Sequence, residues 1–190
     1  MSVAAIEIGH TGPWTVADVL ALPEDRRFRY ELLGESLVMS PAPGVRHQRA
    51  SFRLHVALDT AARAVGAPVE ILEAINVILP SGLVVPDIVV ADAGATAEDG
   101  VSIDAEAVQL VVELVSPGNS TVDRRFKPLL YAEAGIPAYW RLEFEPAPRL
   151  IISELDNGRY TERATALAGA VTTVDNPFPF EIDPAGLARQ

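Results

Sequence analysis

The chain has 190 residues, of which 15 are Lys or Arg and 26 are Asp or Glu, so its formal net charge is −11. This length suits one domain, because single cores stop growing at about 250 to 300 residues, and the hydrophobic share of 49% excludes a disordered chain. The absence of cysteine excludes disulfides, zinc ribbons and thiol nucleophiles and favours a cytoplasmic protein. The acidity disfavours a protein that coats nucleic acid through a basic face.

The first segment, residues 1–14, is expected to be a loose tail. It is a poor signal peptide, because it lacks a basic start and its apolar run is interrupted by Glu7 and His10. No apolar stretch approaches the roughly 18 residues of a membrane span. We therefore expect a single domain over residues 1–190, with a core at about 15–145 and C-terminal strands at about 146–190.

The first structured elements are a short helix and a hairpin. Thr15 and Asp18 have the spacing of a capping box, which predicts a helix running through Leu22. The segment 29–40, RYELLGESLVMS, predicts two short strands around Gly34.

A long amphipathic helix is expected next, over residues 45–65. Its apolar residues recur at steps of three and four, and Gly66 stands where a C-terminal cap belongs. Apolar segments at 69–79 and 83–90 are separated by Pro-Ser-Gly, which predicts paired strands joined by a turn.

The remaining elements indicate a mixed sheet. The almost wholly apolar segment 108–115 predicts a central strand covered on both faces. A helix within 122–134 and a strand at 137–144 complete a βαβ-like crossover. Segments 150–155 and 159–163 flank an Asp-Asn-Gly turn and predict a hairpin. The fold class is therefore α/β, with a mixed central sheet flanked by helices.

Two carboxylates stand within apolar strand segments. Asp87 lies in LVVPDIVV and Glu113 in LVVELVS. Burying an unpaired carboxylate costs several kcal/mol, so a positive partner is expected for each. One divalent cation between neighbouring strands would satisfy both, and oxygen ligands suit magnesium or manganese. Alternatively, each side chain points outward into water at a strand end.

The chain contains a single lysine, Lys127, beside fourteen arginines. Arginine evidently supplies the ordinary surface charge, so the lysine indicates a position that needs a compact ammonium, such as a contact with an attacking water or a phosphate oxygen. The alternative is a surface ion pair with Asp123, four residues earlier on a helix, worth about 0.3 to 0.5 kcal/mol.

These motifs resemble the Uma-type restriction-endonuclease-like proteins of the PD-(D/E)xK nuclease superfamily, from about Thr15 to about Glu143. The similar runs are RYELLGESLVMSPAPGVRHQ, VPDIVV and VVELVSPGNSTVDRRFKPLLYAEAGIPAYWRLE. The resemblance is specific because several motifs occur in the family's order: Pro86-Asp87, Glu113 with Ser116 and Pro117, Asp123, Lys127, Tyr131 and Tyr139-Trp140.

The resemblance implies a restriction-endonuclease-like fold and a metal-dependent phosphodiester hydrolase, expected to be a DNA endonuclease that uses Mg²⁺ or Mn²⁺. Asp87, Glu113 and the backbone carbonyl of Leu114 would bind the metal, which lowers the pKa of the attacking water. Lys127 would stabilise the charge that develops on the phosphate.

The chain departs from the superfamily pattern at one point. The superfamily's lysine stands two residues after the acidic residue, where this chain has Val115. Lys127 must therefore act from the following helix. Pro128 indicates that this helix either begins near Lys127 or is kinked there.

Further residues are expected to support the site. Glu31 is either an additional metal-site carboxylate or an ordinary strand residue. His47 could orient a phosphate or a carboxylate, although a hydrogen-bonded core histidine is the favoured interpretation. Asp123 is expected to orient Lys127, and Arg124 and Arg125 contact either phosphate or only water.

The aromatic residues Tyr131, Tyr139 and Trp140 are predicted to be core or dimer surface rather than base-stacking platforms. A homodimer is expected, because two sites can then address two strands. The acidic balance would be offset if five arginines form a local basic rim: Arg46, Arg49, Arg53, Arg124 and Arg125.

Two other functions stay open. The chain could be a catalytically inactive nuclease fold that serves as an interaction module, although the joint presence of Asp87, Glu113 and Lys127 argues against it. It could also be a metal-dependent hydrolase of a small phosphoester, which would tolerate an acidic surface better. The sequence does not distinguish DNA from RNA as the substrate.

Overall fold

The computed structural model describes residues 10–23, 25, 27–96, 100–115 and 121–188. Its helices are α1 (Val16–Leu20), α2 (Val45–Val65), α3 (Lys127–Glu133) and α4 (Ala185–Ala188), with 3₁₀ turns η1 (Ala93–Ala95) and η2 (Ala105–Ala107) and a π-helical turn η3 (Val122–Phe126). Its strands are β1 (Phe28–Leu33), β2 (Ser36–Pro41), β3 (Val69–Glu73), β4 (Asn76–Leu79), β5 (Gly82–Val84), β6 (Ile88–Asp92), β7 (Ser102–Asp104), β8 (Val108–Leu114), β9 (Ala138–Glu143), β10 (Arg149–Asp156), β11 (Arg159–Leu167), β12 (Thr172–Val174) and β13 (Phe180–Ile182).

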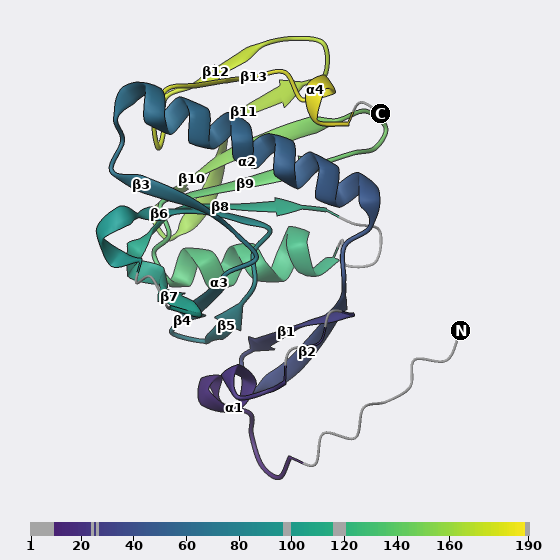
Figure 1. The fold of residues 1–190 in the computed structure, drawn as a ribbon, viewed down its shortest axis with the longest axis vertical. Coiled ribbons are helices and arrows are strands. Elements are labelled where there is room, and N and C mark those ends of the chain that lie inside the picture. Colours follow the sequence, from purple (N-terminus) through teal and green to yellow (C-terminus); the bar gives the residue numbers. More distant parts are fainter. Residues whose placement is uncertain (1–9, 24, 26, 97–99, 116–120, 189–190) are drawn as a thin grey trace.

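The strands form a large mixed sheet and two smaller sheets. The large sheet has the order β11-β10-β9-β8-β6-β3, with β8 and β9 parallel and the other neighbours antiparallel. A second sheet has the order β2-β1-β5-β4-β7, and β12 pairs with β13. Figure 1 shows β1, β2 and α1 at one end of the molecule and β12, β13 and α4 at the other. The predicted mixed sheet flanked by helices is confirmed.

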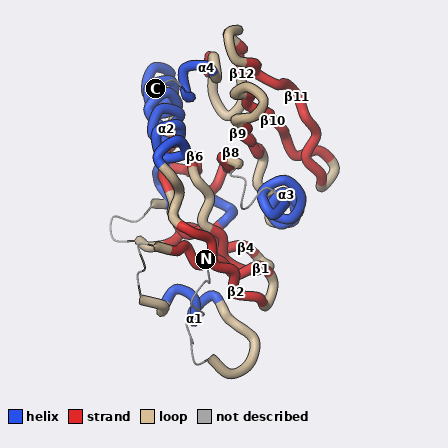
Figure 2. Tube along the Cα trace, turned by 90° about the vertical axis from the view of Figure 1, so that its right-hand side faces the viewer, coloured by secondary structure: helices blue, strands red, loops and turns tan. Residues whose placement is uncertain are grey.

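Helices cover both faces of the large sheet, with α2 on one side and α3 on the other (Figure 2). Side chains alternate between the two faces, as strand geometry requires. On the α2 face, Leu54 and Leu58 pack with Trp140 and other strand residues. On the α3 face, Tyr131 packs with the buried residues Val111 and Tyr139. The central position predicted for residues 108–115 is therefore confirmed.

The long helix has the predicted bounds. It runs from Val45 to Val65 and ends at Gly66, whose φ of 65° lies in the left-handed region that glycine tolerates. The predicted short helix ends two residues before Leu22, and its capping box between Thr15 and Asp18 is present.

The helix that carries Lys127 begins as a π turn. The N–H of Lys127 bonds to the carbonyl of Val122, five residues earlier, and regular α-helix follows. Pro128 lies in the first turn of that α-helix, where its missing N–H costs nothing. The helix then leads into β9, parallel to β8, so the expected βαβ crossover is confirmed.

The two predicted strands at 69–79 and 83–90 are each divided. A break at Ala74, where φ is 52°, separates β3 from β4, and residues 85–87 separate β5 from β6. β4 and β5 form the expected antiparallel pair, whereas β3 and β6 pair in the large sheet. Asp87 therefore lies just before a strand, at the point where two sheets diverge, and the prediction that it lies within a strand is wrong.

The C-terminal hairpin forms as predicted, with Asn157 and Gly158 both at positive φ between β10 and β11. None of the described helices is both long enough and apolar enough to cross a membrane. Most of the predicted N-terminal tail, residues 1–9, and the motif residues Ser116 and Pro117 lie outside the described residues. The single domain stays a prediction.

Candidate active site

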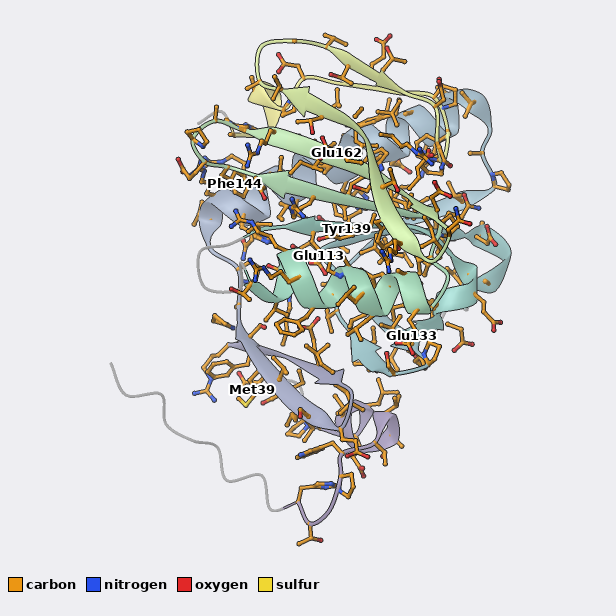
Figure 3. The ribbon with its side chains drawn as sticks, turned by 180° about the vertical axis from the view of Figure 1, so that it is seen from behind. Met39, Glu113, Glu133, Tyr139, Phe144 and Glu162 are labelled. Carbon is orange, nitrogen blue, oxygen red and sulfur yellow. The ribbon has the colours of Figure 1, made fainter. Side chains whose placement is uncertain are left out.

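A polar cavity of about 250 Å³ opens where the two larger sheets diverge, beside the start of α2 and the π turn. Its walls come from β1, β2, the junction between β5 and β6, the end of β8 and the start of α3. Figure 3 shows Glu113 on the face of the large sheet that α3 covers. The cavity brings together all of the acidic, basic and imidazole residues singled out as catalytic or supporting: Glu31, His47, Asp87, Glu113, Asp123 and Lys127.

Lys127 is a buried cation held by carboxylates. Its side chain is only 5% exposed, and Nζ lies 2.8 Å from Glu31 Oε1, 3.0 Å from Glu113 Oε1 and 3.9 Å from Asp123 Oδ1. Burial alone would lower the pKa of Lys127, but the negative charges of Glu113, Glu31 and Asp123 outweigh burial and raise it. The alternative of a surface ion pair with Asp123 is wrong, because both side chains of this pair are buried.

Glu113 projects from the central strand into this cluster. Its Oε1 accepts hydrogen bonds from the Tyr131 hydroxyl at 2.6 Å and from Lys127. Burial raises the pKa of Glu113 to about 8, with a further contribution from nearby Asp87, although Lys127 acts in the opposite direction. At neutral pH, Glu113 therefore favours its protonated form unless additional positive charge is bound beside it.

Asp87 is held by three hydrogen-bonding groups. Oδ1 accepts a bond from Arg29 Nη1 at 2.7 Å, and Oδ2 accepts one from the N–H of Leu114 at 2.8 Å and lies 3.0 Å from His47 Nε2. Burial would raise the pKa of Asp87, but the contacts with His47, Arg29 and Leu114 lower it overall. The ionised carboxylate is therefore stabilised, and His47 orients a carboxylate rather than filling the apolar core.

Glu31 and Asp123 position Lys127 from two sides. Glu31 is 2% exposed, and its Oε1 also accepts the N–H of Val85 at 2.9 Å, which ties β1 to the β5–β6 junction. Burial raises the pKa of Asp123 to about 6, although Lys127 opposes this. The hydroxyl of Tyr139 donates to the backbone carbonyl of Asp123 at 2.6 Å and so anchors the π turn.

The structure adds Arg29 and the Tyr131 hydroxyl to the predicted site. Arg29 stands two residues before Glu31 on β1, so the two side chains share one face of the strand. The two-residue spacing from Glu31 is the sequence feature that could have identified Arg29 as a site residue. Tyr131 is fully buried, as predicted for a core residue, and no sequence pattern indicated that its hydroxyl bonds to Glu113.

The predicted basic rim forms only in part, because Arg46 and Arg124 meet at the end of β9 whereas Arg53 lies elsewhere. Arg53 donates to the carbonyl of Gly186 at 3.1 Å, beside α4. Arg46 instead pairs with Glu145, and Arg124 donates through Nε to Glu143 at 2.9 Å. Of the remaining two rim residues, Arg49 lies in the first turns of α2, and the exposed Arg125 lies on η3.

The charges of the cavity suit a divalent cation. Four carboxyl groups, those of Glu31, Asp87, Glu113 and Asp123, line it beside two basic side chains, Lys127 and Arg29. Among the described residues, no three His, Cys, Asp or Glu side chains converge as a metal cage. Mg²⁺ commonly keeps several waters and binds through one or two carboxylates plus a substrate phosphate. Carboxylate oxygens of this kind are the donors that Mg²⁺ and Mn²⁺ prefer.

The fold and the buried lysine–carboxylate cluster are consistent with a nuclease-like protein. A family model described as "Uma2: Putative restriction endonuclease" matches residues 16–188, and the chain belongs to this family. The predicted family resemblance is therefore confirmed.

A solved structure supports the same fold. The chain is similar to a putative nuclease belonging to DUF820 from Anabaena variabilis, with a TM-score of 0.69 and 16% sequence identity, over 85% of this chain and 89% of that one. No curated protein matches the sequence. The chain thus shares the fold of that structure, and the family supports a nuclease-like function.

Proposed function

We propose that the protein is a metal-dependent phosphodiesterase that cleaves nucleic acid, with DNA as the expected substrate. The observation that carries this proposal is the buried ammonium of Lys127, which lies between Glu31 and Glu113 in the same cavity as the ionised Asp87. A lysine and carboxylates in one water-accessible cavity are the groups that phosphodiester hydrolysis needs.

Asp87, Glu113 and the carbonyl of Leu114 are the proposed ligands of Mg²⁺ or Mn²⁺. When bound, the ion would neutralise charge on the scissile phosphate and lower the pKa of a water molecule. Arg29 and His47 orient the Asp87 carboxylate through its two oxygens. The Tyr131 hydroxyl fixes the orientation of Glu113.

Lys127 is the proposed donor to the reacting phosphate. Its ammonium is compact and strongly hydrated, and it can direct hydrogen bonds toward Glu31, Glu113 and a phosphate oxygen at once. Glu31 and Asp123 hold it at the cavity wall. In this role it stabilises the negative charge that develops as the phosphodiester bond breaks.

Cleavage of supercoiled plasmid by the purified protein tests this proposal, with Mg²⁺, Mn²⁺ or a chelator. We expect metal-dependent nicking that Asp87→Asn and Lys127→Ala both lose. Arg63→Gln is the matched control, because Arg63 is 80% exposed and pairs with Asp59 on the surface of α2. Nicking that persists in chelator or in Asp87→Asn would overturn the metal assignment.

The other outcomes distinguish the alternatives. Manganese binding without plasmid cleavage would favour a small phosphoester substrate, and the absence of metal binding would favour an inactive interaction module. The homodimer and the cytoplasmic location stay predictions. Light scattering of the purified protein tests the homodimer.

A further inference from the structure

A second charged cluster lies outside the cavity, around Glu143 at the end of β9. The Glu143 side chain is only 4% exposed, yet three guanidinium groups contact it. Arg124 Nε and Arg141 Nε donate to Oε1 at 2.9 and 3.0 Å. Arg149 donates to Oε2 through Nε at 3.1 Å and also through Nη2.

One carboxylate does not neutralise three guanidinium groups. A fourth arginine, Arg46, adjoins the cluster: it contacts the carbonyl of Phe144 at 3.3 Å, lies over the Phe144 ring and pairs with Glu145. Glu145 is 75% exposed. Four positive charges therefore meet two negative charges here, in a chain whose overall charge is −11. This local excess is opposite in sign to the rest of the protein.

The guanidinium groups are accessible and have donors to spare. Side-chain exposure is 46% for Arg124, 22% for Arg141 and 41% for Arg149. Arg124 and Arg141 use only Nε for Glu143, and none of the described residues accepts a hydrogen bond from their Nη groups. Glu143 thus fixes the orientation of planar groups whose outer donors match the geometry of a phosphate.

The cluster adjoins the cavity through two elements. Arg124 directly follows Asp123 on η3. Arg141 is the register partner of Glu113 on the neighbouring parallel strand, and Glu143 lies two residues further along the same face. Figure 3 shows Glu113 and Phe144 toward the same end of the sheet. A chain of phosphates that enters the cavity at Glu113 can therefore extend over the arginines.

We propose that Arg124, Arg141 and Arg149, organised by Glu143, form with the adjoining Arg46 a binding site for a backbone phosphate that neighbours the scissile one. This inference rests on the proposed function and specifies its substrate class as a polynucleotide rather than a small phosphoester. A small phosphoester would have no second phosphate to occupy the arginines. Such contacts fix the register of the nucleic acid and do not depend on its base sequence.

Binding of a fluorescein-labelled DNA duplex, measured by anisotropy in chelator at several salt concentrations, tests the proposal without any cleavage. The Arg124→Gln/Arg149→Gln double variant should bind more weakly than wild type, with a salt slope smaller by about one for each phosphate contact removed. Arg149→Gln alone should lose about half of that slope difference. Arg63→Gln, which removes one positive charge far from the cluster on α2, should behave as wild type.

Glu143→Gln removes a negative charge instead of a positive one. It is a second test that does not depend on the arginine variants being folded. It retains all four arginines, and its amide oxygen can still accept from Arg124 and Arg141, so we expect DNA binding to persist. Equal affinity and salt slope in the double variant and Arg63→Gln would overturn the proposal. If plasmid is not cleaved although duplex binding needs the arginines, the proposed catalytic function fails while this site stands.

Discussion

Lys127→Met removes the cation at the centre of the site and should destabilise the protein strongly at neutral pH. The methionine is similar in length and apolar, so the main change is a loss of charge. Glu113 already favours its protonated form at pH 7, because burial raises its pKa to about 8. The cost therefore falls mainly on Glu31, which is buried and lies 2.8 Å from Nζ in the wild type.

Removing one partner of a buried ion pair costs about 3 to 5 kcal/mol, and we expect a destabilisation of this size at pH 7. The cost should be smaller at pH 5, because Asp123, which lies 3.9 Å from Nζ and whose pKa is raised to about 6 by burial, is protonated there and no longer needs the cation. Lys127 stays charged in wild type across this range, since its pKa is raised.

Urea unfolding followed by far-UV circular dichroism at pH 7 and pH 5 measures both values. Arg125→Met is the matched control, because Arg125 is an exposed cation two residues earlier on the same helix. It should change the free energy of unfolding by less than about 0.5 kcal/mol. A Lys127→Met cost that is equally large at the two pH values would refute the reasoning, since it would reflect packing rather than an unpaired carboxylate.

Three further changes test individual contacts. Tyr131→Phe deletes the hydroxyl that donates to Glu113 at 2.6 Å and should cost about 1 to 3 kcal/mol in urea unfolding; no measurable cost would argue against that bond. Burial would raise the pKa of Glu143, but the three arginines lower that pKa overall. The ionised Glu143 carboxylate therefore stabilises the folded protein at pH values above the pKa it has in the unfolded chain, and this stabilisation is lost as the pH falls through its pKa in the folded protein. Glu143→Gln should thus be less stable than wild type by about 1 kcal/mol at pH 7, with a smaller difference near pH 3 by thermal unfolding; a difference that grows in acid would contradict this sign. Gly82→Ala would place a Cβ 2.0 Å from the Leu32 carbonyl oxygen at a φ of 150° and should cost about 3 kcal/mol or more, whereas Gly94→Ala, with open space at its Cβ, should be near neutral.

Local patterns were sufficient for the elements that depend on nearby residues. The periodicity of residues 45–65 and the glycine at 66 predict α2 at both ends, because a helix and its cap are set within a few residues. The Asn157-Gly158 turn likewise predicts its hairpin. The division of residues 83–90 was missed, because both halves are apolar and the reason for the break is the divergence of two sheets around them.

The candidate site was likewise predicted only where local sequence patterns indicate its residues. The apolar surroundings of Asp87 and Glu113 and the uniqueness of Lys127 indicate three of its members from the sequence alone. Arg29 lies 58 residues from Asp87 in the chain, so no local pattern records their contact. The burial that raises the pKa of Glu113 likewise depends on α3 packing against the sheet.

The central claim is that the buried Lys127 serves catalysis and does not merely neutralise carboxylates. Lys127→Arg keeps a positive charge but replaces the compact ammonium with a planar guanidinium. Cleavage of a labelled DNA duplex and calorimetric binding of Mn²⁺ should be measured on this variant and on wild type. The account predicts that Lys127→Arg binds Mn²⁺ but no longer cleaves DNA, and full cleavage by the variant would contradict it.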